Sequence, residues 1–178
     1  MEASTLLTPR VSGALSPCVK LLLLRHAAAE DARPGLSDAD RALTPRGRER
    51  MAAAVPGLLA RGLQPARLLS SPLLRACQTA EIVSEASGTP VEILAALAAL
   101  PSEKLLAELK GDDALAVGHE PWISQLCAWL ATGRIGAAGA FPFKKGGAAL
   151  LEGEPEPGGM QLLAFLPPRV LRALGDAG

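Results

Sequence analysis

Apolar residues along this chain gather in short continuous runs, and these runs alternate with stretches of helical periodicity. The first run, from Val19 to Leu24, is continuous rather than alternating, which is typical of a strand buried on both faces. Similar runs predict further strands at 67–70, 91–94, 114–117, 148–151 and 161–166, the last two joined by a turn-rich segment.

Signals for helix starts lie between these strands. Thr44-Pro45 places a capping residue before a proline at the first helical position, and Pro56-Gly57 predicts a kink or an early end to that helix. Ser71-Pro72 repeats the start signal for a helix that continues to Gly88. Two more helices are predicted, from Ser102 to Gly111 and from Pro121 to Gly133. Because strands alternate with helices, we expect an α/β domain with a mainly parallel sheet.

Length and composition narrow the class of protein. A chain of 178 residues suits one domain, and we expect a flexible, Ser/Thr/Gly/Pro-containing tail at 1–17 followed by a domain at 18–178. Eighteen basic and eighteen acidic residues give a formal net charge of +0, so we expect no nucleic-acid partner. The hydrophobic fraction of 49% indicates a buried core. The longest purely aliphatic run, Leu21 to Leu24, is too short to span a bilayer, so no membrane partner is expected.

Cysteine and histidine are scarce and widely spaced. Cys18, Cys77 and Cys127 form neither a disulfide framework nor a Cys-x-x-Cys knuckle, and a reducing, cytoplasmic setting is the simplest interpretation. His26 and His119 are the only two histidines, so there is no close ligand pair of the His-x-x-x-His kind. We therefore expect no metal and no cofactor.

Basic and polar side chains follow three of the predicted strands. Arg25-His26 follows the first strand, Arg75 lies in the first helical turn after the second, and His119-Glu120 follows the strand at 114–117. Ligands of open α/β sheets bind at the carboxyl ends of the strands, so we expect these side chains to lie together. Two arginines and two histidines beside helix N-termini favour an anion, and phosphate is the obvious candidate.

The same residues carry a resemblance to a known family. Leu24-Arg25-His26 resembles the phosphate-pocket motif of the histidine phosphatases, a superfamily that also contains the cofactor-dependent phosphoglycerate mutases. Three further segments, at 43–47, 70–80 and 117–121, fall in the family's order, and together they look most like the short branch typified by the phosphohistidine phosphatase SixA. The resemblance runs from Val19 to the C-terminus. It implies a three-layer α/β/α sandwich of the phosphoglycerate mutase type.

The resemblance also implies a role for each matched residue. His26 is expected to be the nucleophile that takes the phosphoryl group, while Arg25 and Arg75 bind its non-bridging oxygens. His119 is expected to donate to the same oxygens, and Arg41 resembles a further basic, substrate-binding residue near the pocket. Such a site works without a metal, because guanidinium and imidazole groups neutralise the charge that develops on the phosphoryl group.

Two departures from the family pattern bear on the substrate. Ala27 stands where the family usually has glycine, a small change. The stretch at 94–100, where sugar-phosphate phosphatases and mutases carry an acid, has no carboxylate. Glu120 is a candidate general acid, and its other interpretation is a carboxylate at a helix N-terminus. A missing acid matters least for a phosphoramidate, because imidazole is easily expelled.

The favoured hypothesis is therefore a metal-independent phosphatase acting on phosphohistidine in a protein. No long insertion caps the pocket, and Lys144-Lys145 is a candidate contact for an acidic partner. Three alternatives stay open: hydrolysis of a small phosphomonoester or nucleotide, a phosphate-binding module without turnover, and a metalloprotein using His26, His119 and carboxylates.

Overall fold

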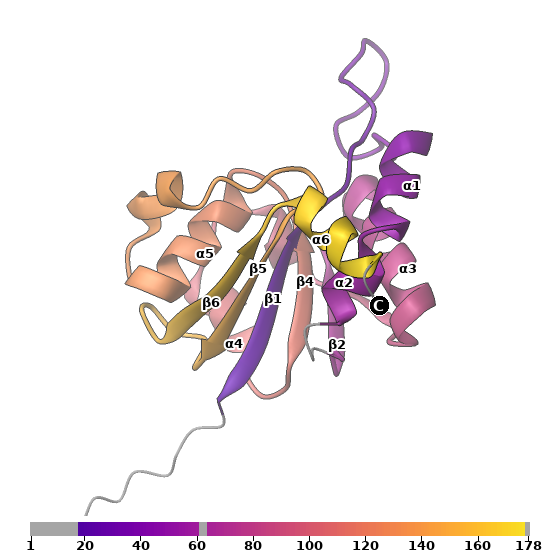
Figure 1. Ribbon diagram of the computed structural model, residues 1–178. Helices are drawn as coiled ribbons and strands as arrows, with labels where there is room; N and C mark the ends of the chain where they lie inside the picture. Colours follow the sequence, from indigo (N-terminus) through magenta and orange to yellow (C-terminus); the bar gives the residue numbers. More distant parts are fainter. Residues whose placement is uncertain (1–17, 61–63, 177–178) are drawn as a thin grey trace, which may run out of the picture.

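The computed structural model describes residues 18–60 and 64–176, and its centre is one mainly parallel sheet (Figure 1). The strand order is β3-β2-β4-β1-β5-β6. β1 runs parallel to β4, and β2 runs parallel to both β4 and β3, whereas β5 is antiparallel to β1 and to β6. The strands are β1 (Val19–Arg25), β2 (Arg67–Ser70), β3 (Val91–Ile93), β4 (Ala114–Gly118), β5 (Ala148–Gly153) and β6 (Met160–Leu166).

Helices cover both faces of the sheet. They are α1 (Pro45–Ala52), α2 (Val55–Leu59), α3 (Leu74–Ser87), α4 (Glu103–Glu108), α5 (Trp122–Thr132) and α6 (Pro168–Gly175), with 3-10 turns η1 (Ala95–Ala98) and η2 (Ile135–Ala140). α1, α2, α3 and α6 share one hydrophobic cluster, and α4 and α5 share the other. The α/β domain that the pattern predicted and the three-layer α/β/α sandwich that the resemblance implied are thus confirmed.

The strand β1 lies in the middle of this arrangement and contributes to both clusters. Leu22 and Leu24 pack on the side of α1 and α3, whereas Leu21 and Leu23 pack on the side of α5. All four side chains are buried, which is why the run is continuously apolar. Burial on both faces fixes the position of the strand's carboxyl end, where Arg25 lies.

Most of the predicted helix boundaries are confirmed by their capping contacts. The backbone N–H of Gly47 donates to Thr44 Oγ1 at 3.0 Å, with Pro45 in the first turn of α1. The expected interruption falls at Ala52, where α1 ends. Ala52 lies four residues before Pro56, and in a continuous helix the proline ring would clash with the carbonyl group of that residue. The hydroxyl of Ser102 accepts from the N–H of Leu105 at 3.3 Å and caps α4.

One predicted helix start was wrong. α3 begins at Leu74, not at Ser71-Pro72, and Leu73 is the extended residue before it. The hydroxyl of Ser71 accepts from the N–H of Leu73 at 3.3 Å, which holds these residues in a turn ahead of the helix. Leu73 is accordingly only half-buried.

Two other features differ from the sequence pattern or lie beyond what the structure describes. The helix α6 was not predicted. It has no capping side chain, and only Leu171 among its residues is fully buried, so the sequence carries little signal for it. The tail expected at 1–17 lies outside the described residues, so its boundary stays a prediction. Within the described parts of the chain, no helix combines the length and apolar character needed to cross a bilayer.

Candidate active site

Three neighbouring parallel strands bring the predicted site residues together at their carboxyl ends. Arg25, the last residue of β1, pairs in register with Gly118, the last residue of β4. His26 and His119 therefore leave the sheet side by side, with ring centroids 5.7 Å apart. β2 ends on the other side of β4, and α3 after it carries Arg75 in its first turn. The four residues that motif spacing placed in one site thus converge.

His26 is held as a neutral imidazole with one free lone pair. Its side chain is 5% exposed, and its Nδ1 lies 2.7 Å from the carbonyl oxygen of Ala27. A carbonyl oxygen only accepts, so Nδ1 carries the proton and Nε2 keeps its lone pair. Burial lowers the pKa of His26 to about 3, and the positive charge of Arg75 adds to that effect, although the Ala27 carbonyl opposes it.

Around His26 lie buried nitrogens whose hydrogen-bonding capacity the described residues do not use. Both ring nitrogens of His119 and the Nε atoms of Arg25 and Arg75 are buried without a partner among those residues. Burial lowers the pKa of His119 to about 4, with the charge of Arg75 adding to it. Unpaired buried polar groups cost about 1–3 kcal/mol each. A tetrahedral oxyanion would supply acceptors for these arginine nitrogens and for a protonated His119 nitrogen.

Local contacts hold the arginines and the loop after β1. Arg25 Nη1 donates to the carbonyl oxygen of Phe143 at 2.6 Å. The buried hydroxyl of Thr79 accepts from the N–H of Ala27 at 3.1 Å and donates to the carbonyl of Arg75 at 2.6 Å. Thr79 thus ties the residue after His26 to the helix that carries Arg75. In the sequence analysis Thr79 was part of the 70–80 motif and had no role of its own.

Asp38 is a site residue that the sequence reasoning missed. Its carboxylate lies 2.9 Å from Arg75 Nη2, and its carbonyl oxygen accepts from Arg75 Nη1 at 2.5 Å. The hydrogen bond from Arg75 is the main reason that the pKa of Asp38 lies below its ordinary value. The N–H of Leu74 donates to the carbonyl of Ala39 at 2.9 Å and fixes this loop against α3. In the sequence, the only signal for Asp38 is its position in an Asp-rich loop that precedes the 43–47 motif.

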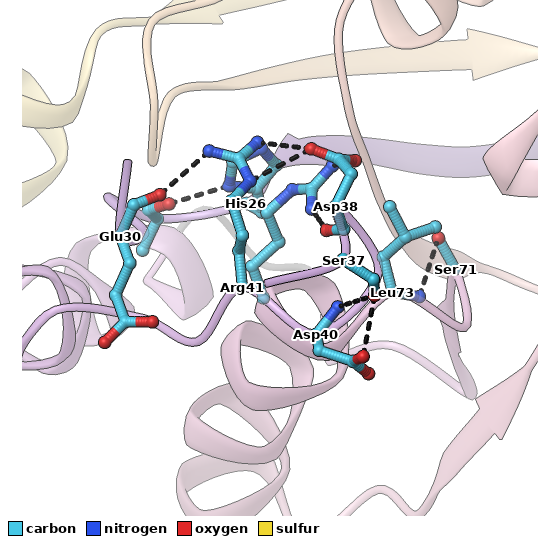
Figure 2. Close-up of polar contacts among 10 residues, drawn as sticks. His26, Glu30, Ser37, Asp38, Asp40, Arg41, Ser71 and Leu73 are labelled. Carbon is cyan, nitrogen blue, oxygen red and sulfur yellow. Dashed lines mark hydrogen bonds and ion pairs between the residues drawn. The ribbon is translucent and has the colours of Figure 1, made fainter. Parts of the chain in front are cut away.

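Arg41 reaches the same carboxylate from the other side (Figure 2). Its Nη2 lies 2.8 Å from Asp38 Oδ1, and its Nη1 donates to the carbonyl oxygen of Glu30 at 2.8 Å. Asp38 therefore bridges Arg41 and Arg75. The structure thus connects Arg41 to Arg75 through a carboxylate, and the substrate-binding role that the family resemblance implies for Arg41 stays a prediction.

Glu120 lies at the edge of the site. Its Oε1 lies 2.7 Å from the hydroxyl of Ser124, which also lies 2.6 Å from the carbonyl oxygen of Phe141. Burial lowers the pKa of Arg25, and the negative charge of Glu120 partly offsets that effect. The stretch at 94–100 contributes the apolar turn η1, whose Leu97 carbonyl lies close to Gly118 at the end of β4. Within the described ranges, no three His, Cys, Asp or Glu side chains are grouped so as to hold a metal ion.

Comparisons with known proteins agree with this geometry. The family model of the histidine phosphatase superfamily (branch 1) matches residues 21–100. An uncharacterized protein of Picosynechococcus sp. is 34% identical over 126 residues, which cover 66% of this chain and 76% of that protein. The chain belongs to the histidine phosphatase superfamily, and it is a phosphatase of that superfamily.

Two solved structures are among those similar to this chain. One was assigned as the phosphohistidine phosphatase SixA of Agrobacterium tumefaciens; it is 28% identical, with a TM-score of 0.69, and the match covers 84% of this chain and 98% of that one. The other is a mycobacterial glucosyl-3-phosphoglycerate phosphatase, 20% identical with a TM-score of 0.67, and the match covers 85% of this chain and all of that one (100%). The second likeness is one of fold.

Proposed function

We propose that this protein removes phosphoryl groups from phosphohistidine in another protein, through a covalent intermediate on Nε2 of His26. The observation that carries the proposal is the tautomer of His26, since the Nδ1–H bond to the Ala27 carbonyl leaves a neutral Nε2 lone pair. Arg25, Arg75 and His119 lie close enough to His26 to influence its pKa, and each carries buried nitrogens that lack partners among the described residues.

The proposed reaction has two steps. The Nε2 lone pair of His26 attacks phosphorus in line, and the bond from phosphorus to the substrate imidazole breaks. That imidazole leaves as a neutral ring once its other nitrogen has taken a proton from solvent. Water then attacks the phosphorus on His26, the Nε2–P bond breaks, and inorganic phosphate leaves. Arg25, Arg75 and His119 stabilise the charge on the phosphoryl oxygens in both steps.

The carboxylates near the site support a phosphoramidate substrate. A general acid must be protonated before it can serve an alkoxide leaving group. The arginines lower the pKa of Asp38, so it is ionised near neutral pH. Glu120 Oε1 lies 2.7 Å from the hydroxyl of Ser124, whose single proton is shared with the carbonyl oxygen of Phe141 at 2.6 Å. An imidazole leaving group needs neither of them.

A second function is hydrolysis of a small phosphomonoester, and the place of Glu120 near Arg25 favours it. Glu120→Gln separates the two functions. We expect the variant to retain phosphohistidine turnover within about threefold, because no carboxylic acid takes part in the proposed step. A loss of phosphoester turnover by about a hundredfold or more would favour the second function. Ser124→Ala is the matched control, since it removes the hydrogen bond and keeps the carboxylate.

The direct test measures phosphate release with EDTA present. Wild type and His26→Ala are compared on a protein phosphorylated on histidine and on p-nitrophenyl phosphate. We expect release that survives EDTA and vanishes in the variant, with the phosphohistidine protein as the better substrate. Phosphate release that is unchanged by His26→Ala would refute the mechanism. If the phosphoryl group is radiolabelled and the label stays on His26 of the wild type without release, the protein is a phosphate-binding module. Activity abolished by EDTA would revive the metalloprotein alternative.

A further inference from the structure

A cavity lies beside the candidate active site, on the side of α1 and α6. Its volume is about 730 Å³, within the range of pockets that hold ligands. Apolar side chains line much of it, from α1, from the segment before β5 and from the end of β6. They are Met51, Phe143, Phe165 and Leu166 together with Pro167 and Pro168.

Basic side chains surround this apolar lining. They are Arg50, Lys144, Lys145, Arg169 and Arg172, and no Asp or Glu lines the cavity. None of the five forms an ion pair with another described residue. The chain as a whole carries equal numbers of basic and acidic residues, so this cluster reflects local segregation of charge rather than overall composition. The N-terminus of α6 adds its positive dipole end to the same place.

The cavity is joined to the active site through short backbone contacts. The N–H of Gly146 lies 3.1 Å from the carbonyl oxygen of Arg25 and 3.0 Å from that of His26. Gly146 has a φ of 74°, a left-handed conformation that favours glycine, and the turn places Lys144 and Lys145 at the cavity. Ala27, which accepts the His26 Nδ1 proton, also lines the cavity. An occupant of the cavity would therefore lie next to the phosphoryl-transfer site.

We propose that this cavity docks an acidic, leucine-containing segment of the phosphorylated protein, with its carboxylates on the five basic residues and its apolar side chain against the partly exposed Phe165 and Leu166. The inference rests on the proposed function, because it assigns the cavity to the same protein substrate. Complementary charge supports it, since an anionic segment is attracted to a cationic rim and a neutral or basic one is not. The apolar lining adds a requirement that a bare anion does not meet.

Two matched peptides test the proposal. Both carry one phosphohistidine, flanked in one by Glu and Leu and in the other by Gly and Ser. We expect wild type to hydrolyse the acidic peptide about tenfold better in kcat/KM, through a lower KM. The paired variant Lys145→Glu/Arg169→Glu should abolish that preference while keeping p-nitrophenyl phosphate turnover. Lys104→Glu, on exposed α4 across the sheet, is the matched control and should keep the preference.

Several results would overturn the proposal. Equal hydrolysis of the two peptides by wild type would do so, as would a preference that survives in the paired variant. A loss of turnover on every substrate in the paired variant would show that these side chains act on catalysis instead of docking.

Failure of the proposed function is recognised separately. If wild type hydrolyses neither peptide, binding of the unphosphorylated, fluorescein-labelled acidic peptide is measured by anisotropy. Binding that the paired variant loses and Lys104→Glu keeps would support the cavity as a docking site without the phosphohistidine activity. The docking site would be refuted if the peptide does not bind. It would also be refuted if the cavity binds octanoate, a simple fatty-acid anion, and not the peptide.

Discussion

The two histidines make the stability of this protein a reporter of its candidate active site. They are the only histidines in the sequence, and both are at least 95% buried in the site. Burial lowers the pKa of His26 to about 3 and that of His119 to about 4, from an ordinary value of 6.5. In the unfolded chain both rings titrate normally, so between about pH 6.5 and about pH 4 the unfolded state binds more protons. Stability must therefore fall as the pH is lowered through this window.

The size of the effect follows from these values. At about pH 5.5 an unfolded histidine is mostly protonated and its folded counterpart is not, which destabilises the fold by about 1.4 kcal/mol relative to about pH 7.5. Two such residues give about 3 kcal/mol. For a chain of 150–250 residues this lowers Tm by about 6–12 °C. Most carboxylates titrate below about pH 5.5, so the two histidines dominate the change in stability between about pH 5.5 and about pH 7.5.

Thermal unfolding followed by circular dichroism at about pH 5.5 and about pH 7.5 measures this difference. The double variant His26→Gln/His119→Gln should lose most of it, because glutamine does not titrate. Tungstate, a tetrahedral oxyanion, should raise Tm of wild type by occupying the site. A Tm that is flat across the window in wild type, or an unchanged slope in the double variant, would refute the reasoning.

Two further predictions concern the loop after β1 and the packing of α2. Asp38→Asn should tighten tungstate binding by about two- to tenfold in a titration, because the exposed carboxylate of Asp38 competes with the anion for Arg75. Weaker binding in the variant would make Asp38 a positioning residue instead. Gly57→Ala should lower the free energy of unfolding by about 1–3 kcal/mol in a urea titration, because the added methyl group would overlap the carbonyl of Leu171 in α6. Gly136→Ala, where the added methyl group meets nothing, is its control and should change stability little.

Local signals in the sequence were sufficient for most of the fold. The continuous apolar run of β1 predicted a strand buried on both faces, and Thr44-Pro45 predicted the start of α1, because capping and burial depend on a few neighbouring residues. Where neighbouring signals competed, the pattern misled. Ser71-Pro72 has the letters of a helix start, but the serine hydroxyl bonds to Leu73 and the helix begins later.

The candidate site was predictable because its residues follow strand ends. Arg25, His26 and His119 come directly after buried runs, and parallel strands place their carboxyl ends at one edge of a sheet. Glu120 and Arg41 were named by resemblance, and the structure places Glu120 near Arg25 and connects Arg41 to Arg75 through Asp38. Their roles remain predictions.

Only the tertiary structure decided how the remaining chemistry is arranged. The bridge from Asp38 to Arg75 joins residues 37 positions apart, and the cavity beside His26 joins α1 to residues more than 90 positions later. Such contacts depend on the packing of helices on a sheet and leave no local pattern. The sequence by itself determined which residues carry charge and where most of the buried strands lie, because those properties depend on side chains and their spacing along the chain. The fold decided which charges meet, because that depends on the distances between elements that only packing sets.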